Sequence, residues 1–258
     1  MNASTPSGSL SLSQAKPSDT ERGPNLGAAE LRQNRILASM SEADADRWRA
    51  RIEPVAMPLG KVLHESGIAL THAYFPTTAI VSLLYLSGNG DSGAIAMIGN
   101  EGVVGIPLIM GGGSTPSRAV VQNAGVGFRM AAPAFREEFV RSESIRRSLL
   151  LYTQALIAQM AQMAACNRHH TIPQQLCRWL LLCLDRLRTD EIVVTQELIA
   201  QTLGVRREGV TEAALNLQRD GLIRYRRGRI VVLDRPQLEL RSCECYAAIK
   251  AEYARLLT

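Results

Sequence analysis

The feature that most constrains this sequence is the stretch from Thr195 to Arg229, where a helical pattern stops at one glycine and then resumes. Apolar residues recur at helical spacing on both sides of the break, which predicts two helices packed against each other. Ala200 is small enough to let the helices approach, and Gly204 can take the left-handed turn between them. The stretch therefore predicts a helix-turn-helix, whose apolar positions are Ile199, Leu203, Val210, Ala214 and Leu217.

The second of these helices carries polar side chains at its N-terminal end, on or beside the face opposite its apolar residues. In helix-turn-helix proteins, this end of the second helix enters the major groove and contacts base edges. We therefore expect a DNA-contacting face on this helix. Its residues are Arg207, Glu208, Thr211 and Glu212.

A basic hairpin follows at once. Arginines crowd residues 224–229, and Ile230 to Leu233 form a returning strand after Gly228. Guanidinium groups on such a hairpin, or wing, can neutralise DNA phosphates and release counterions. The alternative is a plain pair of helices followed by a solvated basic loop. The residues that we expect to hold the DNA backbone are Thr195, Gln196, Arg206, Arg226, Arg227 and Arg229.

The segment LGVRREGVTEAALNLQRDGLI resembles the DNA-binding segment of the Crp/Fnr family of bacterial regulators. A helix expected from Ile172 to Leu187 resembles the first helix of that family's winged domain. The resemblance implies an α+β fold, with a jelly-roll-like β-roll sensor domain, a long dimerisation helix and a C-terminal winged helix-turn-helix. It also implies a homodimer on a palindromic DNA site, with RNA polymerase as a further partner.

Within this resemblance, Arg207 and Glu208 occupy the family's base-contacting positions. An arginine there would donate to guanine O6 and N7, and a glutamate would accept from cytosine N4. Glu212 stands where the cyclic-AMP relative has an arginine, so the preferred half-site should differ. Arg206 replaces a capping serine, which weakens the helix start but adds a phosphate contact.

The chain has 258 residues, enough for two small domains, and a net charge of +5 that suits a nucleic-acid partner without requiring one. Residues 1–25, rich in Ser, Pro and Gly, are expected to be a disordered tail. The β-roll sensor domain should cover residues 26–140, the dimerisation helix 141–170 and the winged domain 171–258. Thr171-Ile172-Pro173 should end the dimerisation helix and act as a hinge between it and the winged domain.

The N-terminal half alternates short apolar runs with turn residues, which is typical of a β-roll, barrel or sandwich. We expect one helix over Leu26–Trp48, with Ser41 as a cap inside it, a hairpin turn at 87–91, and one helix from Asp234 through Leu257. The expected strands are Val62–His64, Ala73–Phe75, Ala79–Leu86, Ala94–Ile98, Ala119–Gln122 and Gly127–Met130.

Cyclic-nucleotide-binding relatives hold ribose with a Gly-Glu pair and the cyclic phosphate with an arginine and a hydroxyl residue. Here the glycine is present at Gly105, but Ile106 stands where the acid would be. Ser117 and Arg118 could still grip a phosphate, although in reversed order. These departures argue against cyclic-AMP binding and favour Arg118 as a surface or salt-bridge residue.

From about residue 142 to 168, apolar residues recur at alternating steps of four and three, as in a coiled coil. The spacing predicts a long helix that pairs with its twin, although a helix buried in its own domain would show the same stripe. Gln159 would then fix the register, and Cys166 would lie near the dyad. The expected dimer seam is Leu149, Tyr152, Leu156, Gln159, Met163 and Cys166.

The five cysteines argue against a secreted disulfide framework and favour the cytoplasm. None precedes Cys166, which excludes the N-terminal iron–sulfur cluster of some relatives. Cys243 and Cys245, two residues apart on one expected helix, make a poor metal pair without other ligands. We therefore expect no metal and no cofactor, and His169 and His170 are interpreted as helix-end residues.

Two other functions stay open. The β-roll could be a small-molecule or cyclic-nucleotide sensor whose winged helix contacts proteins. An enzyme is the weakest alternative, because the sequence has no nucleophile elbow, phosphate-binding loop, paired carboxylates or His-Glu metal motif. No apolar run approaches the roughly 20 residues that span a bilayer.

Overall fold

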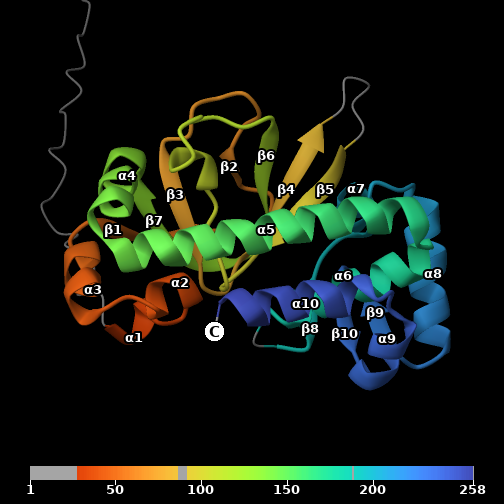
Figure 1. Cartoon of the computed structure of the whole chain (residues 1–258). Helices are drawn as coiled ribbons and strands as arrows, with labels where there is room; N and C mark the ends of the chain where they lie inside the picture. Colours follow the sequence, from red (N-terminus) through yellow and green to blue (C-terminus); the bar gives the residue numbers. More distant parts are fainter. Residues whose placement is uncertain (1–27, 87–91, 188, 258) are drawn as a thin grey trace, which may run out of the picture.

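The computed structural model describes residues 28–86, 92–187 and 189–257. The expected tail over 1–25 and the expected hairpin turn at 87–91 lie outside these residues. A β-roll lies on one side of the long helix α5 (Glu143–His169), and the N-terminal helices and most of the winged domain lie on the other side (Figure 1). The second helix of the helix-turn-helix, α8 (Arg207–Arg219), lies at the end of the molecule opposite the N-terminal helices (Figure 1).

The N-terminal segment forms three short helices rather than the single expected one: α1 (Ala28–Leu31), α2 (Arg35–Ala38) and α3 (Glu42–Arg49). The buried side chain of Asn34 explains the first break. Its Oδ1 caps α2 by accepting from two backbone N–H groups, and its Nδ2 donates to the carbonyls of Pro76 and Gly102, both at 2.8 Å. Ser41 caps α3 as expected, accepting from the N–H of Asp44 at 3.1 Å.

The β-roll consists of two antiparallel sheets. One holds β1 (Ile52–Met57), β7 (Gly125–Ala131) and β3 (His72–Pro76) in that order. The other holds β2 (Val62–His64), β6 (Ser117–Asn123), β4 (Ile80–Leu86) and β5 (Ser92–Ile98), and the short helix η1 (Ile106–Leu108) precedes β6. All six expected strands are present, and β1 is an additional strand that the sequence did not single out.

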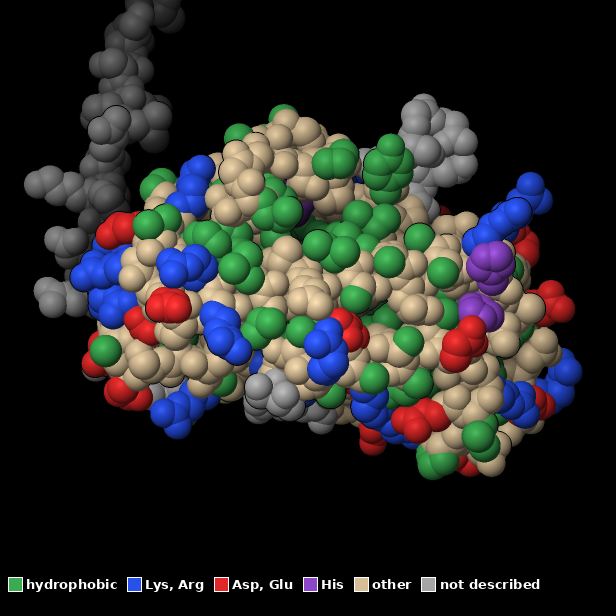
Figure 2. Space-filling view, viewed as in Figure 1, with side chains coloured by type: hydrophobic (Ala, Val, Ile, Leu, Met, Phe, Trp, Pro, Cys, Tyr) green, Lys and Arg blue, Asp and Glu red, His purple; other side chains and the backbone are tan. Residues whose placement is uncertain are grey.

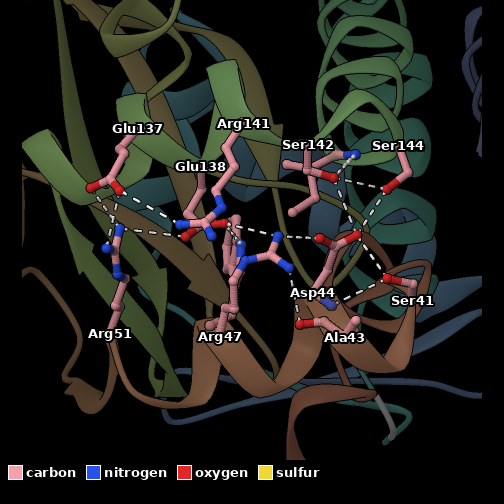
Figure 3. A network of polar contacts seen from close by, with 12 residues as sticks. Ser41, Ala43, Asp44, Arg47, Arg51, Glu137, Glu138, Arg141, Ser142 and Ser144 are labelled. Atoms are coloured by element: carbon pink, nitrogen blue, oxygen red, sulfur yellow. Dashed lines mark hydrogen bonds and ion pairs between the residues drawn. The ribbon is translucent and has the colours of Figure 1, made fainter.

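A polar network joins α3 to α4 (Ala132–Arg141), a helix that the sequence did not predict. Figure 3 shows acidic side chains of α4 facing Arg47 of α3 and Arg51 of the turn that leads into β1. Glu138 is fully buried and accepts from the indole N–H of Trp48 at 3.2 Å, while Arg47 and Arg51 each lie 3.4 Å from its carboxylate. Buried charge is tolerated here because it is paired on several sides.

The helix α5 begins after Ser142, whose hydroxyl caps it, and ends where the break at Thr171-Ile172-Pro173 was expected. There, Thr171 and Gln174 form a capping box that starts α6 (Ile172–Leu184). By length and composition α5 could also cross a membrane, as many core helices could. Its apolar stripe is instead buried in this protein, against the β-roll and α10 (Cys245–Leu256).

The winged domain continues with β8 (Glu191–Val193), α7 (Gln196–Leu203), α8 (Arg207–Arg219), β9 (Ile223–Arg226) and β10 (Arg229–Val232). The three strands form an antiparallel sheet in the order β8-β10-β9. The single helix expected from Asp234 through Leu257 is wrong: α9 (Arg235–Arg241) ends at Ser242, and α10 starts at Cys245. Asp234 caps α9 by accepting from the N–H of Gln237 at 3.0 Å.

Candidate nucleic-acid interface and sensor cavity

The two helices of the predicted motif are α7 and α8. Thr195 caps α7, its hydroxyl accepting from the N–H of Leu198 at 3.2 Å. Gly204 ends α7 in the left-handed conformation, with φ of 66°. The backbone N–H of the next residue, Val205, donates a hydrogen bond to the carbonyl oxygen of Ala200 at 3.1 Å. The five apolar residues predicted to pack this motif are all buried. The predicted helix-turn-helix is therefore present.

The polar face of α8 is open to solvent. Arg207, Glu208 and Glu212 are exposed on it. Thr211 is half-buried and donates its hydroxyl to Gln196 Oε1 at 2.9 Å or to Arg207 O at 3.0 Å. The structure therefore leaves three of the four predicted base contacts free on one face, and it uses Thr211 with Gln196 to hold α7 against α8.

The exposed face of α8 extends one turn further than the sequence reasoning did. Leu215, Asn216 and Arg219 line a shallow groove on it together with Glu208 and Glu212. The helical spacing of the polar residues continues through these positions, so the same periodicity could have found them. Leu215 is 55% exposed, and an apolar side chain there suits contact with a thymine methyl group.

The wing is a two-residue hairpin. Arg227 and Gly228 both have positive φ, 49° and 76°, which is the geometry that matches the twist of the flanking strands. Arg226 lies directly opposite Arg229 across the pair, and both side chains are exposed. Two positive charges that face each other across a strand pair repel and destabilise the hairpin. The phosphates of a bound nucleic acid would reduce this repulsion. Arg229 also forms an ion pair with Glu191 of β8.

A cavity of about 300 Å³ lies between the β-roll and α5, and most of the side chains that line it are apolar. Figure 2 shows hydrophobic side chains gathered around this hollow. Of the three predicted effector residues, Gly105 and Ser117 line the cavity, whereas Arg118 does not. Neighbouring residues of a strand face opposite sides, and Arg118 instead pairs with Glu65 at 3.1 Å. The predicted phosphate grip is therefore not assembled.

Among the described residues that line this cavity, His64 is the one with a titratable side chain. The Nε2 atom of His64 is buried with no hydrogen-bond partner in the described part of the chain. Burial lowers the pKa of His64, against smaller raising effects of the Ser117 backbone and Glu65. A neutral imidazole nitrogen in an apolar cavity can donate or accept one hydrogen bond from a ligand.

Residues 174–241 match the family described as the Crp-like helix-turn-helix domain. FixK2 from Bradyrhizobium japonicum is similar in structure, with a TM-score of 0.65 at 16% identity over 74% of this chain and 98% of that one. A transcriptional regulator of the CRP/FNR family from Thermus thermophilus has a TM-score of 0.57 at 18% identity, over 74% and 98%. The chain has the fold of the Crp/Fnr transcriptional regulators.

A further solved structure of this fold is the regulator CLP of Xanthomonas campestris, which responds to c-di-GMP. Its TM-score is 0.59 at 14% identity, over 75% of this chain and 100% of that one. A comparison with curated proteins found no match to the sequence. At these identities the likeness to the solved structures concerns the fold, and the ligand of CLP is not carried over to this chain.

Within this Crp/Fnr fold, the predicted dimer seam needs correction. All six of its residues are buried inside the single chain, against the β-roll, the winged domain and α10. Gln159 donates to Met97 O at 3.0 Å and accepts from Arg186 at 3.2 Å, while Cys166 faces Cys243. The heptad spacing correctly identified a buried face, but it could not show that the partner was the same chain. The corrected residues are Leu149, Tyr152, Leu156, Gln159, Met163 and Cys166.

A second stripe of the same spacing runs along the exposed face of α5. Leu150 and Ile157 are 54% and 56% exposed, so the single chain leaves two large apolar side chains of this stripe open to solvent. Ala161 and Ala164 continue the stripe with side chains small enough for a second helix to approach closely. The exposed stripe, at steps of four and three, is Leu150, Gln154, Ile157, Ala161, Ala164 and Arg168.

Proposed function

We propose that this protein is a sequence-specific transcriptional regulator that binds a palindromic DNA site as a homodimer in the cytoplasm. The observation that carries the proposal is the exposed polar face of α8 beside a wing whose arginines Arg226, Arg227 and Arg229 are exposed. The major groove of DNA admits an α-helix, so α8 would enter it with this face towards the bases, and the wing would lie over the adjacent backbone. RNA polymerase is the further partner that such a regulator would contact.

The roles of individual residues follow from their exposure. Arg207 would donate to a guanine and Glu208 would accept from a cytosine, with Glu212 and Leu215 contacting the following bases. Arg206, Arg226 and Arg227 would hold phosphates on either side. Thr195, Gln196 and Thr211 have their side chains engaged in capping or in binding α7 to α8, so we propose that they support the interface rather than specify sequence.

We propose that the dimer forms through the exposed stripe of α5. Two such helices crossing at a two-fold axis would bury Leu150 and Ile157 of each copy against the other. Ile157 also lines the apolar cavity, so the partner helix would lie beside the cavity. Occupation of the cavity could then change the helix pairing and, through it, the spacing of the two α8 helices.

Selection from random duplexes tests the function directly. The full-length protein is mixed with a randomised DNA pool, bound molecules are recovered through several rounds, and the enriched sequences are read. We expect an inverted repeat whose half-sites are about one helical turn, roughly 34 Å, apart. Recovery of no enriched sequence, or of a site without two-fold symmetry, would contradict the proposal.

The cavity favours a second activity for the β-roll, the binding of a small apolar effector. None of the described residues that line the cavity is a lysine or an arginine that could bind a phosphate, because Arg118 pairs with Glu65 instead. Calorimetry with cyclic nucleotides should therefore show no binding. The uncharged dye phenylnaphthylamine should bind with a rise in fluorescence, and Met160→Trp, which puts a larger side chain in the cavity lining, should abolish that rise. Tight binding of a cyclic nucleotide would overturn this assignment.

A further inference from the structure

Four side chains with metal-binding atoms converge where the end of α5 meets the turn between α9 and α10. Cys166 lies in the last turn of α5 and His170 directly follows that helix, while Cys243 and Cys245 come from the turn and the start of α10. One ligand atom of each residue lies within 4.8 Å of the ligand atoms of the other three. Residues more than 70 positions apart in sequence are thereby brought into one cluster.

The sequence predicts no metal here, because it places Cys243 and Cys245 two positions apart on one continuous helix. The structure changes that argument in two ways. The helix is broken at Ser242, so the two thiols are no longer held at helical spacing. The fold also supplies the two further ligands, Cys166 and His170, whose absence made the pair poor.

Two distances within the cluster are close to those expected around a single tetrahedral ion. The sulfur atoms of Cys166 and Cys243 are 3.4 Å apart, and Cys245 Sγ lies 3.5 Å from His170 Nδ1. Zinc binds thiolate sulfur at about 2.3 Å and imidazole nitrogen at about 2.0 Å, so a tetrahedron of these ligands has edges of roughly 3.5 to 3.8 Å. The two distances lie within a few tenths of an ångström of these edges, and all four ligand atoms lie within 4.8 Å of one another, so side-chain movements of at most about 1 Å would complete the geometry.

The neighbours of the cluster fit as well. If Nδ1 of His170 bound a metal, its other ring nitrogen, Nε2, would be a donor, and Nε2 lies 3.2 Å from the carboxylate of Glu244. A carboxylate behind a ligating histidine is the usual arrangement at zinc sites, because it fixes the tautomer and orients the ring. Gln162 donates its side-chain N–H to Cys245 Sγ at 3.1 Å, which would stabilise a thiolate there.

The three thiols are buried and His170 is only 16% exposed in its side chain, so the cluster is closed to substrates. We propose that Cys166, His170, Cys243 and Cys245 bind one zinc ion in a tetrahedral site. With four protein ligands and no open position, the ion would be structural rather than catalytic. It would fasten the end of α5 to the turn that follows the wing, and so fix how the winged domain is held on the long helix.

The same four side chains could instead form a disulfide or bind an iron–sulfur cluster, and each alternative would give different experimental results. Cys166 and Cys243 are close enough to form a disulfide after a small adjustment, which would leave no three-thiolate site. An iron–sulfur cluster has several irons that each take their own protein ligand, so it needs ligands further apart than one ion does. Both fates would overturn the proposal, and the experiments below separate them from zinc.

The first measurement uses the full-length wild-type protein and needs no variant. The protein is stripped of metal under anaerobic reduction and titrated with cobalt(II), whose visible absorption bands are intense only in tetrahedral thiolate sites. We expect the bands to rise to an end point at one cobalt per chain and to vanish when one equivalent of zinc is added. Absence of the bands, or bands that zinc does not displace, would overturn the proposal.

The second measurement assigns the ligands. The protein is produced in zinc-supplemented medium, and zinc per chain is measured by mass spectrometry for wild type, His170→Gln and the double variant Cys243→Ser/Cys245→Ser. Cys177→Ser, which removes a buried thiol outside the cluster, is the matched control. We expect one zinc per chain in wild type and control, and a loss of at least tenfold in the double variant.

The remaining outcomes are resolved by thiol counting and iron analysis. All five cysteines of the zinc-free protein should react with a thiol reagent after denaturation without reductant. Three reactive thiols would indicate a disulfide, and iron with acid-labile sulfide in anaerobically purified protein would indicate an iron–sulfur cluster. Equal zinc content in wild type and the double variant would show that the ion is held elsewhere.

Discussion

Glu101 and Arg186 form a buried ion pair that joins the β-roll to the winged domain. The two side chains are 2.8 Å apart and about 7% and 6% exposed. Arg186 also donates to Leu182 O at 2.9 Å and to Gln159 on α5 at 3.2 Å, and the Glu101 carboxylate accepts from the N–H of Gly99. One guanidinium group thus connects the sensor sheet, the long helix and α6.

Removing the acid from this pair should be costly. In Glu101→Ala the guanidinium of Arg186 would remain buried without its counter-charge, which typically costs about 3–5 kcal/mol in the free energy of unfolding. Urea denaturation followed by circular dichroism measures this loss. The matched control is Glu53→Ala, which breaks the exposed pair with Arg129 and should cost at most about 1 kcal/mol. Equal, small losses in both variants would show that the buried pair does not hold the domains together.

Arg207 should determine one base of the half-site. It is exposed at the first turn of α8, so its replacement should cost the folded chain little stability. Arg207→Ala should weaken binding to the selected site by about 1–3 kcal/mol and relax the preference at one base pair. Mobility-shift titrations on the selected site and on its single-base variants measure both effects. If the variant lost the same affinity on selected and random DNA, Arg207 would be only a phosphate contact.

Arg227 should hold a phosphate. It occupies the tip of the wing with φ of 49°, and alanine tolerates that conformation no worse than arginine, so the hairpin should persist. Arg227→Ala should weaken binding to all sequences alike and reduce the dependence of log affinity on log salt by about one unit. A salt series of mobility shifts checks this. Arg141→Ala, an exposed arginine on α4 far from the wing, should leave the slope unchanged.

The helix-turn-helix could be predicted in detail because its determinants are local. Gly204 needs a left-handed conformation and Ala200 a small side chain, and both demands are visible in a few adjacent letters. The strands of the β-roll were also predictable from alternating apolar runs between turn residues. Such patterns hold because the physical cause of each lies within one or two turns of the chain.

The parts that could not be predicted depend on contacts between distant segments. Asn34 breaks the N-terminal helix by donating hydrogen bonds to the carbonyls of Pro76 and Gly102, and no pattern in the nearby sequence predicts these contacts. The apolar stripe of α5 around Gln159 was expected to be buried against a second copy of the helix, but it is buried against other segments of the same chain. The cluster at Cys166 was missed for the same reason, since two of its ligands lie on each of two separate segments.

Asp44 should make stability depend on pH in the acid range. Burial alone would raise the pKa of Asp44, but hydrogen bonds from Ser41, Arg47, Ser144 and Ser142 outweigh it and hold the pKa below its ordinary value of 3.8 (Figure 3). A depressed folded-state pKa contributes stability above the unfolded pKa and loses it as the pH falls through the folded value. The gap in unfolding free energy between wild type and Asp44→Asn should therefore be constant above about pH 5 and shrink below about pH 4. A gap that did not change between about pH 6 and about pH 3 would contradict this.

Leu150 should be required for dimerisation. It is 54% exposed in the single chain, so a charge there costs the folded protomer little, whereas two glutamates facing each other across the dyad would be buried without partners. Leu150→Glu should shift the protein from dimer to monomer in sedimentation experiments at micromolar concentration, with an unchanged circular dichroism spectrum. Binding to the palindromic site should fall by at least tenfold, because one α8 alone contacts half of the site. Val140→Glu, which changes an apolar residue on α4 that is even more exposed than Leu150, should remain dimeric. Should Leu150→Glu stay dimeric while retaining full affinity, the exposed stripe of α5 would not be the interface, and pairing through another surface would have to be sought.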